Sequence, residues 1–84
     1  MYIVRFQSKA LQDLKKLPQE TQRWILRKLE YFAASGSPLI FAHPLKNTKL
    51  GAYRFRVGDY RIIFDLIEGT IMIAAVGHRR EIYR

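Results

Sequence analysis

Two dipeptides, Gly58-Asp59 and Glu68-Gly69, constrain the fold most, because each separates two stretches of β-forming residues. Two-residue connections that contain glycine are typical of β-hairpin turns. The two turns therefore predict a meander of three antiparallel strands, at about 52–57, 60–67 and 70–77. The last of these, TIMIAAVG, is apolar on both faces. It is expected inside the sheet, because a strand at an edge has less of its surface covered.

The N-terminal part of the chain predicts one further strand and two helices. Alternation of residue types over 2–6 is typical of a short strand. Apolar residues at helical spacing then indicate a helix that ends at Pro18 and a second helix over 19–34. With 84 residues, the chain is expected to form one domain around one core. The predicted class is α+β in the order β-α-α-β-β-β, with a helical hairpin packed on one face of a mainly antiparallel four-stranded sheet.

The first turn also predicts how the strands pair. A two-residue turn places Arg56 opposite Arg61 and Arg54 opposite Ile63, so alternation puts all three arginines on one face. The other face is expected to pack beneath the helices and holds Tyr53, Phe55, Val57, Tyr60, Ile62 and Phe64. Like charges directly opposite each other destabilise a sheet. A bound anion would reverse that effect, so the arginine face is the predicted working surface.

The second turn extends this register to the C-terminus. It predicts Val76 opposite Arg61 and Gly77 opposite Tyr60, and it points His78 to the arginine side if the strand continues that far. The expected site contains Arg54, Arg56, Arg61, His78, one or both of Arg79 and Arg80, and Tyr83, above an apolar floor of Ile63 and Ala74. Lys46 and Lys49, in a basic loop, are weaker candidates for contacts to a nucleic-acid backbone. Any single arginine taken alone is as readily explained as a solvated surface residue.

Composition limits the partners and the compartment. Fifteen Lys and Arg against seven Asp and Glu give a net charge of +8, which attracts nucleic acid, an anionic membrane or an acidic protein. The chain has no cysteine, so it suits a reducing compartment, and the cytoplasm is expected. The longest apolar run, 71–76, is too short to span a bilayer, and the N-terminus lacks the features of a signal peptide. No membrane association is expected.

The residue types also limit the chemistry. Two widely spaced histidines and no cysteine make a poor metal site, so no metal or other cofactor is expected. Scattered carboxylates argue against hydrolysis by paired acids. What remains is RNA cleavage in which a 2′-hydroxyl attacks the adjacent phosphate and arginines stabilise the added charge. An arginine cannot remove the proton, so this task needs Tyr83, His78, a substrate group or another partner.

The segments YRFRVGDYRIIFDL and VGHRREIYR, together with LKKLP near the end of the first helix, resemble the RelE/ParE superfamily of toxin-antitoxin toxins, particularly the RelE-like mRNA interferases. The resemblance covers nearly the whole chain. It implies a toxin that cleaves mRNA in the ribosomal A site and is neutralised by a small antitoxin, with which it binds operator DNA. By motif position, it implies catalytic roles for Arg54, Arg56, Arg61, Arg79 and Tyr83. Lys46, Lys49, His78 and Arg80 are then expected to bind RNA.

The sequence also departs from the family pattern. Well-known members carry lysines at the positions of Arg54 and Arg56, and a lysine of lowered pKa can accept a proton where an arginine cannot. The general base is therefore open. Two alternatives follow from the same resemblance: a ParE-like inhibitor of DNA gyrase, and a catalytically weak module that binds nucleic acid or an antitoxin.

Overall fold

The computed structural model describes residues 2–46 and 48–83. Its elements are β1 (Ile3–Phe6), α1 (Ser8–Lys15), α2 (Gln19–Ala34), a 3-10 turn η1 (Pro38–Phe41), β2 (Ala42–Pro44), β3 (Tyr53–Val57), β4 (Tyr60–Ile67) and β5 (Thr70–His78). The predicted bounds of α2 and β4 are confirmed, and those of β3 and β5 differ by one residue each.

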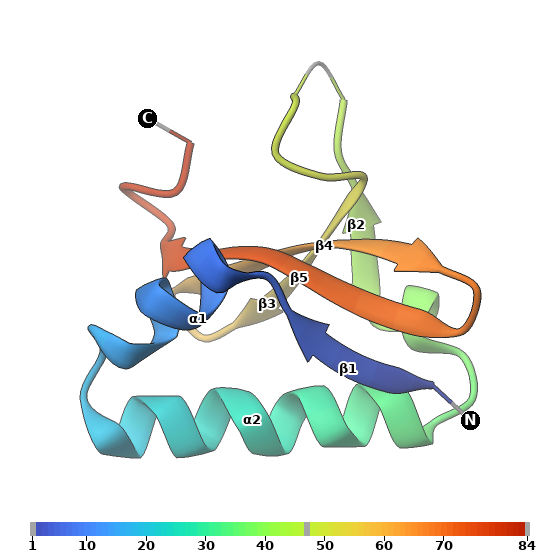
Figure 1. The fold of residues 1–84 in the computed structure, drawn as a ribbon, viewed down its shortest axis with the longest axis horizontal. Helices are drawn as coiled ribbons and strands as arrows, with labels where there is room; N and C mark the ends of the chain where they lie inside the picture. The colour runs from blue at the N-terminus through green and yellow to red at the C-terminus, as the bar shows by residue number, and fades with distance from the viewer. Residues whose placement is uncertain (1, 47, 84) are drawn as a thin grey trace.

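The strands form one mixed sheet in the order β1-β5-β4-β3-β2. β1 is parallel to β5, and the other neighbours are antiparallel. The sheet has five strands instead of the predicted four, because residues 42–44 add a short edge strand that pairs with β3. β5 lies between β1 and β4, which confirms its interior position. The α+β class and the packing of helices on the sheet are as predicted (Figure 1).

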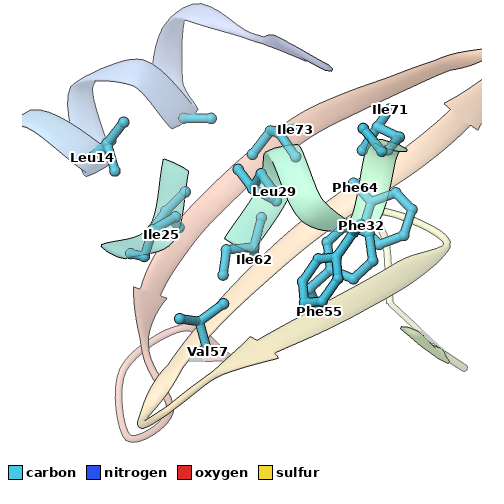
Figure 2. Packing of buried hydrophobic residues seen from close by; sticks show 13 residues of the cluster. Leu14, Ile25, Leu29, Phe32, Phe55, Val57, Ile62, Phe64, Ile71 and Ile73 are labelled. Atoms are coloured by element: carbon cyan, nitrogen blue, oxygen red, sulfur yellow. The ribbon is translucent and has the colours of Figure 1, made fainter. Parts of the chain in front are cut away.

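The core lies between α2 and one face of the sheet. At its centre, the ring of Phe55 stacks on Phe64 with centroids 4.2 Å apart and lies 4.5 Å from Phe32 of α2. Figure 2 shows these rings beside the aliphatic side chains that α2 and β5 contribute. The predicted apolar face is confirmed, since Phe55, Val57, Ile62 and Phe64 are all buried in this cluster and Tyr53 and Tyr60 pack against it.

α1 closes the edge of β5 beyond the end of β1. β1 pairs with β5 only as far as Ile73. Further along, the backbone N–H of Val76 donates to Asp13 Oδ2 at 3.1 Å, and Lys9 Nζ donates to the same oxygen at 2.7 Å. A buried backbone donor is thus satisfied where no strand continues the ladder. In the described part of the chain, neither helix has the length and apolar character needed to cross a bilayer.

Candidate functional site

The site begins with the pairing of β3 and β4, which follows the predicted register. Arg56 lies opposite Arg61 and Arg54 opposite Ile63. All three arginines therefore share the face of the sheet away from α2, as expected. They differ in exposure: Arg56 is exposed, Arg54 is half-buried, and Arg61 retains only 7% of its surface. The hairpin thus buries one of the three arginines and leaves the other two more accessible.

Arg61 is held by the backbone of its own turn. Its Nη1 donates to the carbonyl oxygens of Gly58 at 3.1 Å and Tyr60 at 3.2 Å. Within residues 2–46 and 48–83, ion pairs form only between Lys9 and Asp13 and between Arg79 and Asp59. Among these residues, Arg61 is therefore a buried cation with no carboxylate partner. Such a charge is costly to bury without compensation.

Other charged side chains act on the pKa of Arg61. Burial lowers the pKa of its guanidinium, and the charges of Arg54 and Arg56 lower that pKa further. The Tyr83 phenolate would raise this pKa, and Arg79 lowers it. An arginine remains protonated at neutral pH in spite of such a shift. The crowding therefore produces a concentrated positive potential that favours a bound anion.

The second hairpin departs from the predicted register. Ile63 pairs with Ala75, but the next residue, Phe64, pairs with Ile73, which leaves Ala74 unpaired as a β-bulge. Beyond the bulge, Arg61 lies opposite Gly77 and Tyr60 opposite His78. The predictions that Val76 lies opposite Arg61 and Gly77 opposite Tyr60 were therefore wrong by one residue. An extra residue in one strand reverses the alternation of every side chain that follows.

Two predicted site residues change faces as a result. His78 shares the helix-covered face with Tyr60, and their ring centroids are 5.8 Å apart. The prediction that His78 points to the arginine side was wrong. The floor beneath the arginines is formed by Ile63 with Ala75 instead of Ala74, and both residues are buried.

The chain turns back after β5 and brings its C-terminal residues to Arg61. The N–H groups of Glu81 and Ile82 donate to the carbonyl of His78 at 2.9 and 3.0 Å. Ile82 packs over Gly77, where an added Cβ would lie 3.0 Å from Ile82 Cδ1. Gly77 is the residue opposite Arg61. The glycine therefore leaves room for the turn on the arginine face, and Tyr83, with 48% of its surface exposed, follows this turn.

Asp59 ties Arg79 to the turn between β3 and β4. The Arg79 backbone N–H donates to the Asp59 carbonyl at 2.8 Å, and Arg79 Nε lies 3.7 Å from Asp59 Oδ1. Arg80 is exposed, and its N–H donates to His78 Nδ1 at 3.2 Å. Of these two arginines, Arg79 is therefore the one joined to the turn that also holds Arg61. From the sequence, Asp59 is expected only as a turn residue, without a contact to an arginine. Its position between Arg56 and Arg61 in the sequence is the signal that could have indicated such a contact.

The two candidate lysines, Lys46 and Lys49, are exposed in the segment between β2 and β3. This segment and the C-terminal turn both project from the sheet on the side away from α2 (Figure 1). Gly51 of the segment packs on Ile63, whose Cγ2 would lie 2.8 Å from an added Cβ. The segment that carries both lysines therefore lies on the same side of the sheet as the arginines.

Comparison with known proteins gives consistent matches in sequence. Residues 4–83 match the family described as the ParE toxin of type II toxin-antitoxin system, parDE. A relative, toxin RelG of Mycobacterium tuberculosis (strain ATCC 25618 / H37Rv), is 36% identical over 88 residues, which cover 99% of this chain and 97% of the relative.

Solved structures give the same result. The toxin-antitoxin complex RelBE2 of Mycobacterium tuberculosis contains a similar chain, with a TM-score of 0.76, 31% identity, and coverage of 93% of this chain and 98% of that chain. A chain of the RelB-RelE antitoxin-toxin complex of Methanococcus jannaschii has a TM-score of 0.71 and 30% identity, with 93% of each chain covered. The intact RelBE complex of E. coli, at 20% identity and a TM-score of 0.72, shows likeness of fold.

Proposed function

Because the chain belongs to the RelE/ParE family of type II toxin-antitoxin toxins, we propose that it is a ribosome-dependent endoribonuclease that cleaves mRNA. The observation that supports this proposal most is the burial of Arg61, without a carboxylate partner among the described residues, within the electrostatic influence of three further arginines and Tyr83. A site of this kind is complementary to the phosphate of an RNA backbone, which is anionic and accepts several hydrogen bonds.

In the proposed reaction, the 2′-oxygen of a nucleotide attacks its adjacent phosphorus and the bond from phosphorus to the 5′-oxygen breaks. The products are a 2′,3′-cyclic phosphate and a free 5′-hydroxyl. Arg61 and Arg79 stabilise the negative charge that develops on the phosphate, as pre-positioned donors do in other phosphoryl and acyl transfers. Arg54 and Arg56 orient the phosphate from the rim of the site.

The reaction also moves two protons, one from the 2′-hydroxyl and one to the departing 5′-oxygen. No arginine can accept the first, even with the lowered pKa of Arg61. His78 faces Tyr60 on the other side of the sheet. The first proton is therefore assigned to an acceptor group of the RNA or the ribosome. Tyr83 is the side chain at the arginine cluster that can donate the second proton to the 5′-oxygen, and it regains a proton from solvent.

The partner that fits this surface is an acidic antitoxin. The RelBE2 and RelB-RelE structures are complexes of a toxin with an antitoxin. A chain of net charge +8 binds RNA indiscriminately unless its charge is covered. We therefore expect a cognate antitoxin whose acidic segment covers Arg54, Arg56 and Arg61 and which carries the complex to operator DNA. Copurification of an acidic protein with the tagged chain tests this, and a harmless chain that needs no partner in cells would contradict it.

The nuclease itself is tested by primer extension on an mRNA during translation in vitro. Wild type is expected to produce new 5′ ends within the translated region. Arg61→Ala is expected to reduce their rate of formation by about a hundredfold or more. Arg27→Gln, an exposed change on α2, serves as the control of equal charge. Undiminished cleavage by a folded Arg61→Ala variant would refute the assignment.

A second function has one specific observation in its favour, namely that the matching family is described as the ParE toxin. In this alternative the chain binds and inhibits DNA gyrase and cuts no RNA. A supercoiling assay with purified gyrase distinguishes the two. Loss of supercoiling together with intact mRNA would replace the nuclease proposal with the gyrase one.

A further inference from the structure

Trp24 is the one tryptophan of the chain, and it lies outside the core. It belongs to α2, whose buried stripe consists of Ile25, Leu29, Phe32 and Ala33. The indole keeps 39% of its surface exposed. It also borders an open cavity of about 470 Å³, lined by Glu20, Thr21, Arg23, Trp24 and Arg27. Filling the core therefore does not account for the placement of this large side chain.

The indole packs instead against the turn between β3 and β4. A Cβ added at Gly58 would lie 2.9 Å from Trp24 Cζ3 and closer still to Cη2. Gly58 has a φ of +59°, in the region that favours glycine. The turn backbone and the indole are therefore in direct contact, with no side chain between them.

The other side of this turn holds two arginines of the candidate site. The Gly58 carbonyl accepts from Arg61 Nη1 at 3.1 Å, and the Asp59 carbonyl accepts from the Arg79 N–H at 2.8 Å. These two acceptors belong to the dipeptide on which Trp24 rests. A shift of the turn would therefore displace Arg61 and Arg79 together, although they come from different parts of the chain.

We propose that Trp24 is a positioning residue, which holds the Gly58-Asp59 turn so that its two carbonyls fix Arg61 and Arg79 for phosphate binding. The inference rests on the proposed function for its catalytic consequence, but its structural content does not need catalysis. Small displacements of positioned groups reduce catalysis strongly while substrate binding through other contacts persists. Trp24 therefore acts on the rate of the chemical step through the turn, without touching RNA.

The first test measures how firmly Trp24 holds the Gly58-Asp59 turn. In Trp24→Ala, hydrogen exchange of the Arg79 amide, followed by NMR, is expected to speed up about tenfold, because the turn opens more easily. The amide of Ile73 in β5 is expected to be unchanged. Leu26→Ala is the matched control, since Leu26 is an apolar residue of α2 that is also 39% exposed. Equal exchange of the Arg79 amide in wild type, Trp24→Ala and Leu26→Ala would overturn the inference.

The second test measures the rate of single-turnover mRNA cleavage on programmed ribosomes. Trp24→Ala is expected to lower the maximal rate about tenfold to a hundredfold, with an unchanged half-saturating ribosome concentration. Leu26→Ala should match wild type. An unchanged maximal rate in Trp24→Ala, or a fall in its ribosome affinity alone, would refute positioning. If wild type itself does not cut mRNA, the proposed function fails, and hydrogen exchange still decides the role of Trp24.

Discussion

The two faces of the β3–β4 hairpin are made by alternate residues of the same strands, yet they are stabilised differently. On the face toward α2, every buried side chain is apolar and meets another, as Phe55 meets Phe32 and Phe64 (Figure 2). On the opposite face, Arg61 is buried to a similar degree, and its guanidinium donates to two carbonyl oxygens of its own hairpin. The first face stabilises the fold, and the second carries positive charge without a carboxylate partner on Arg61 among the described residues.

The difference shows how a small chain can carry a cluster of like charges on one face of its sheet. A domain of 84 residues has little stability to spare, so the cost of crowding arginines must be met by one continuous core. The aromatic stack and the buried stripe of α2 form this core. They lie against the opposite face of the strands that carry Arg54, Arg56 and Arg61. Truncation of an apolar side chain on the face toward α2 is therefore expected to lower the free energy of unfolding strongly. Substitution of an arginine on the opposite face is expected to change it little or to raise it.

The largest effect is expected for Phe55→Ala. Phe55 is fully buried and stacks between two other rings, so its truncation should lower the free energy of unfolding by about 3–5 kcal/mol. Arg54→Ala, one residue away on the other face, should lower it by less than about 1 kcal/mol. Urea denaturation followed by circular dichroism measures both. Similar losses for the two variants would mean that the faces do not differ as described.

The next effect concerns the two hairpin turns. Gly58→Ala should lower the free energy of unfolding by about 2 kcal/mol, since it forces a side chain into a positive φ and against Trp24. Gly69→Ala should cost about 1 kcal/mol, because Gly69 also has a positive φ but has no atom within 4 Å of an added Cβ. Thermal unfolding of the two variants checks the order, and a larger loss at Gly69 would reverse the interpretation.

A smaller effect is expected from an anion that occupies the arginine face. Inorganic phosphate at ten times its dissociation constant should raise the free energy of unfolding by about 1.4 kcal/mol over chloride at equal ionic strength. Arg61→Gln should abolish most of this gain, whereas Arg27→Gln on α2 should leave it intact. Thermal melts over a phosphate series provide the measurement. An equal response in both variants would place the bound anion elsewhere.

The smallest effect is expected for the like-charge pair across the hairpin. Arg56→Gln removes the exposed member of the Arg56–Arg61 pair, so at low salt without phosphate it should raise the free energy of unfolding by about 0.2–1 kcal/mol. About 1 M sodium chloride should remove the gain by screening. Arg23→Gln, an exposed change on α2, serves as the control. A loss of stability in Arg56→Gln would show that the repulsion is already compensated within the chain.

Much of the fold follows from local patterns that act over a few residues. Helical spacing of apolar side chains between Pro18 and Ser35 was enough to predict α2 with both ends correct. The Gly58-Asp59 turn was enough to predict the pairing of Arg56 with Arg61, because a two-residue turn leaves one register. The arginine face and the apolar face are therefore encoded in the sequence of one hairpin.

The remaining features depend on contacts between distant parts of the chain. The bulge at Ala74 turns His78 away from the arginines, and no local pattern marks it, because β5 is apolar on both faces and either register buries it. The burial of Arg61, the choice of Arg79 over Arg80 and the support of Gly58 by Trp24 likewise arise only when the C-terminal turn and α2 reach the same hairpin. Periodicity determined which residues share a strand face, and tertiary packing decided which of them meet, because such meetings depend on residues far apart in the sequence.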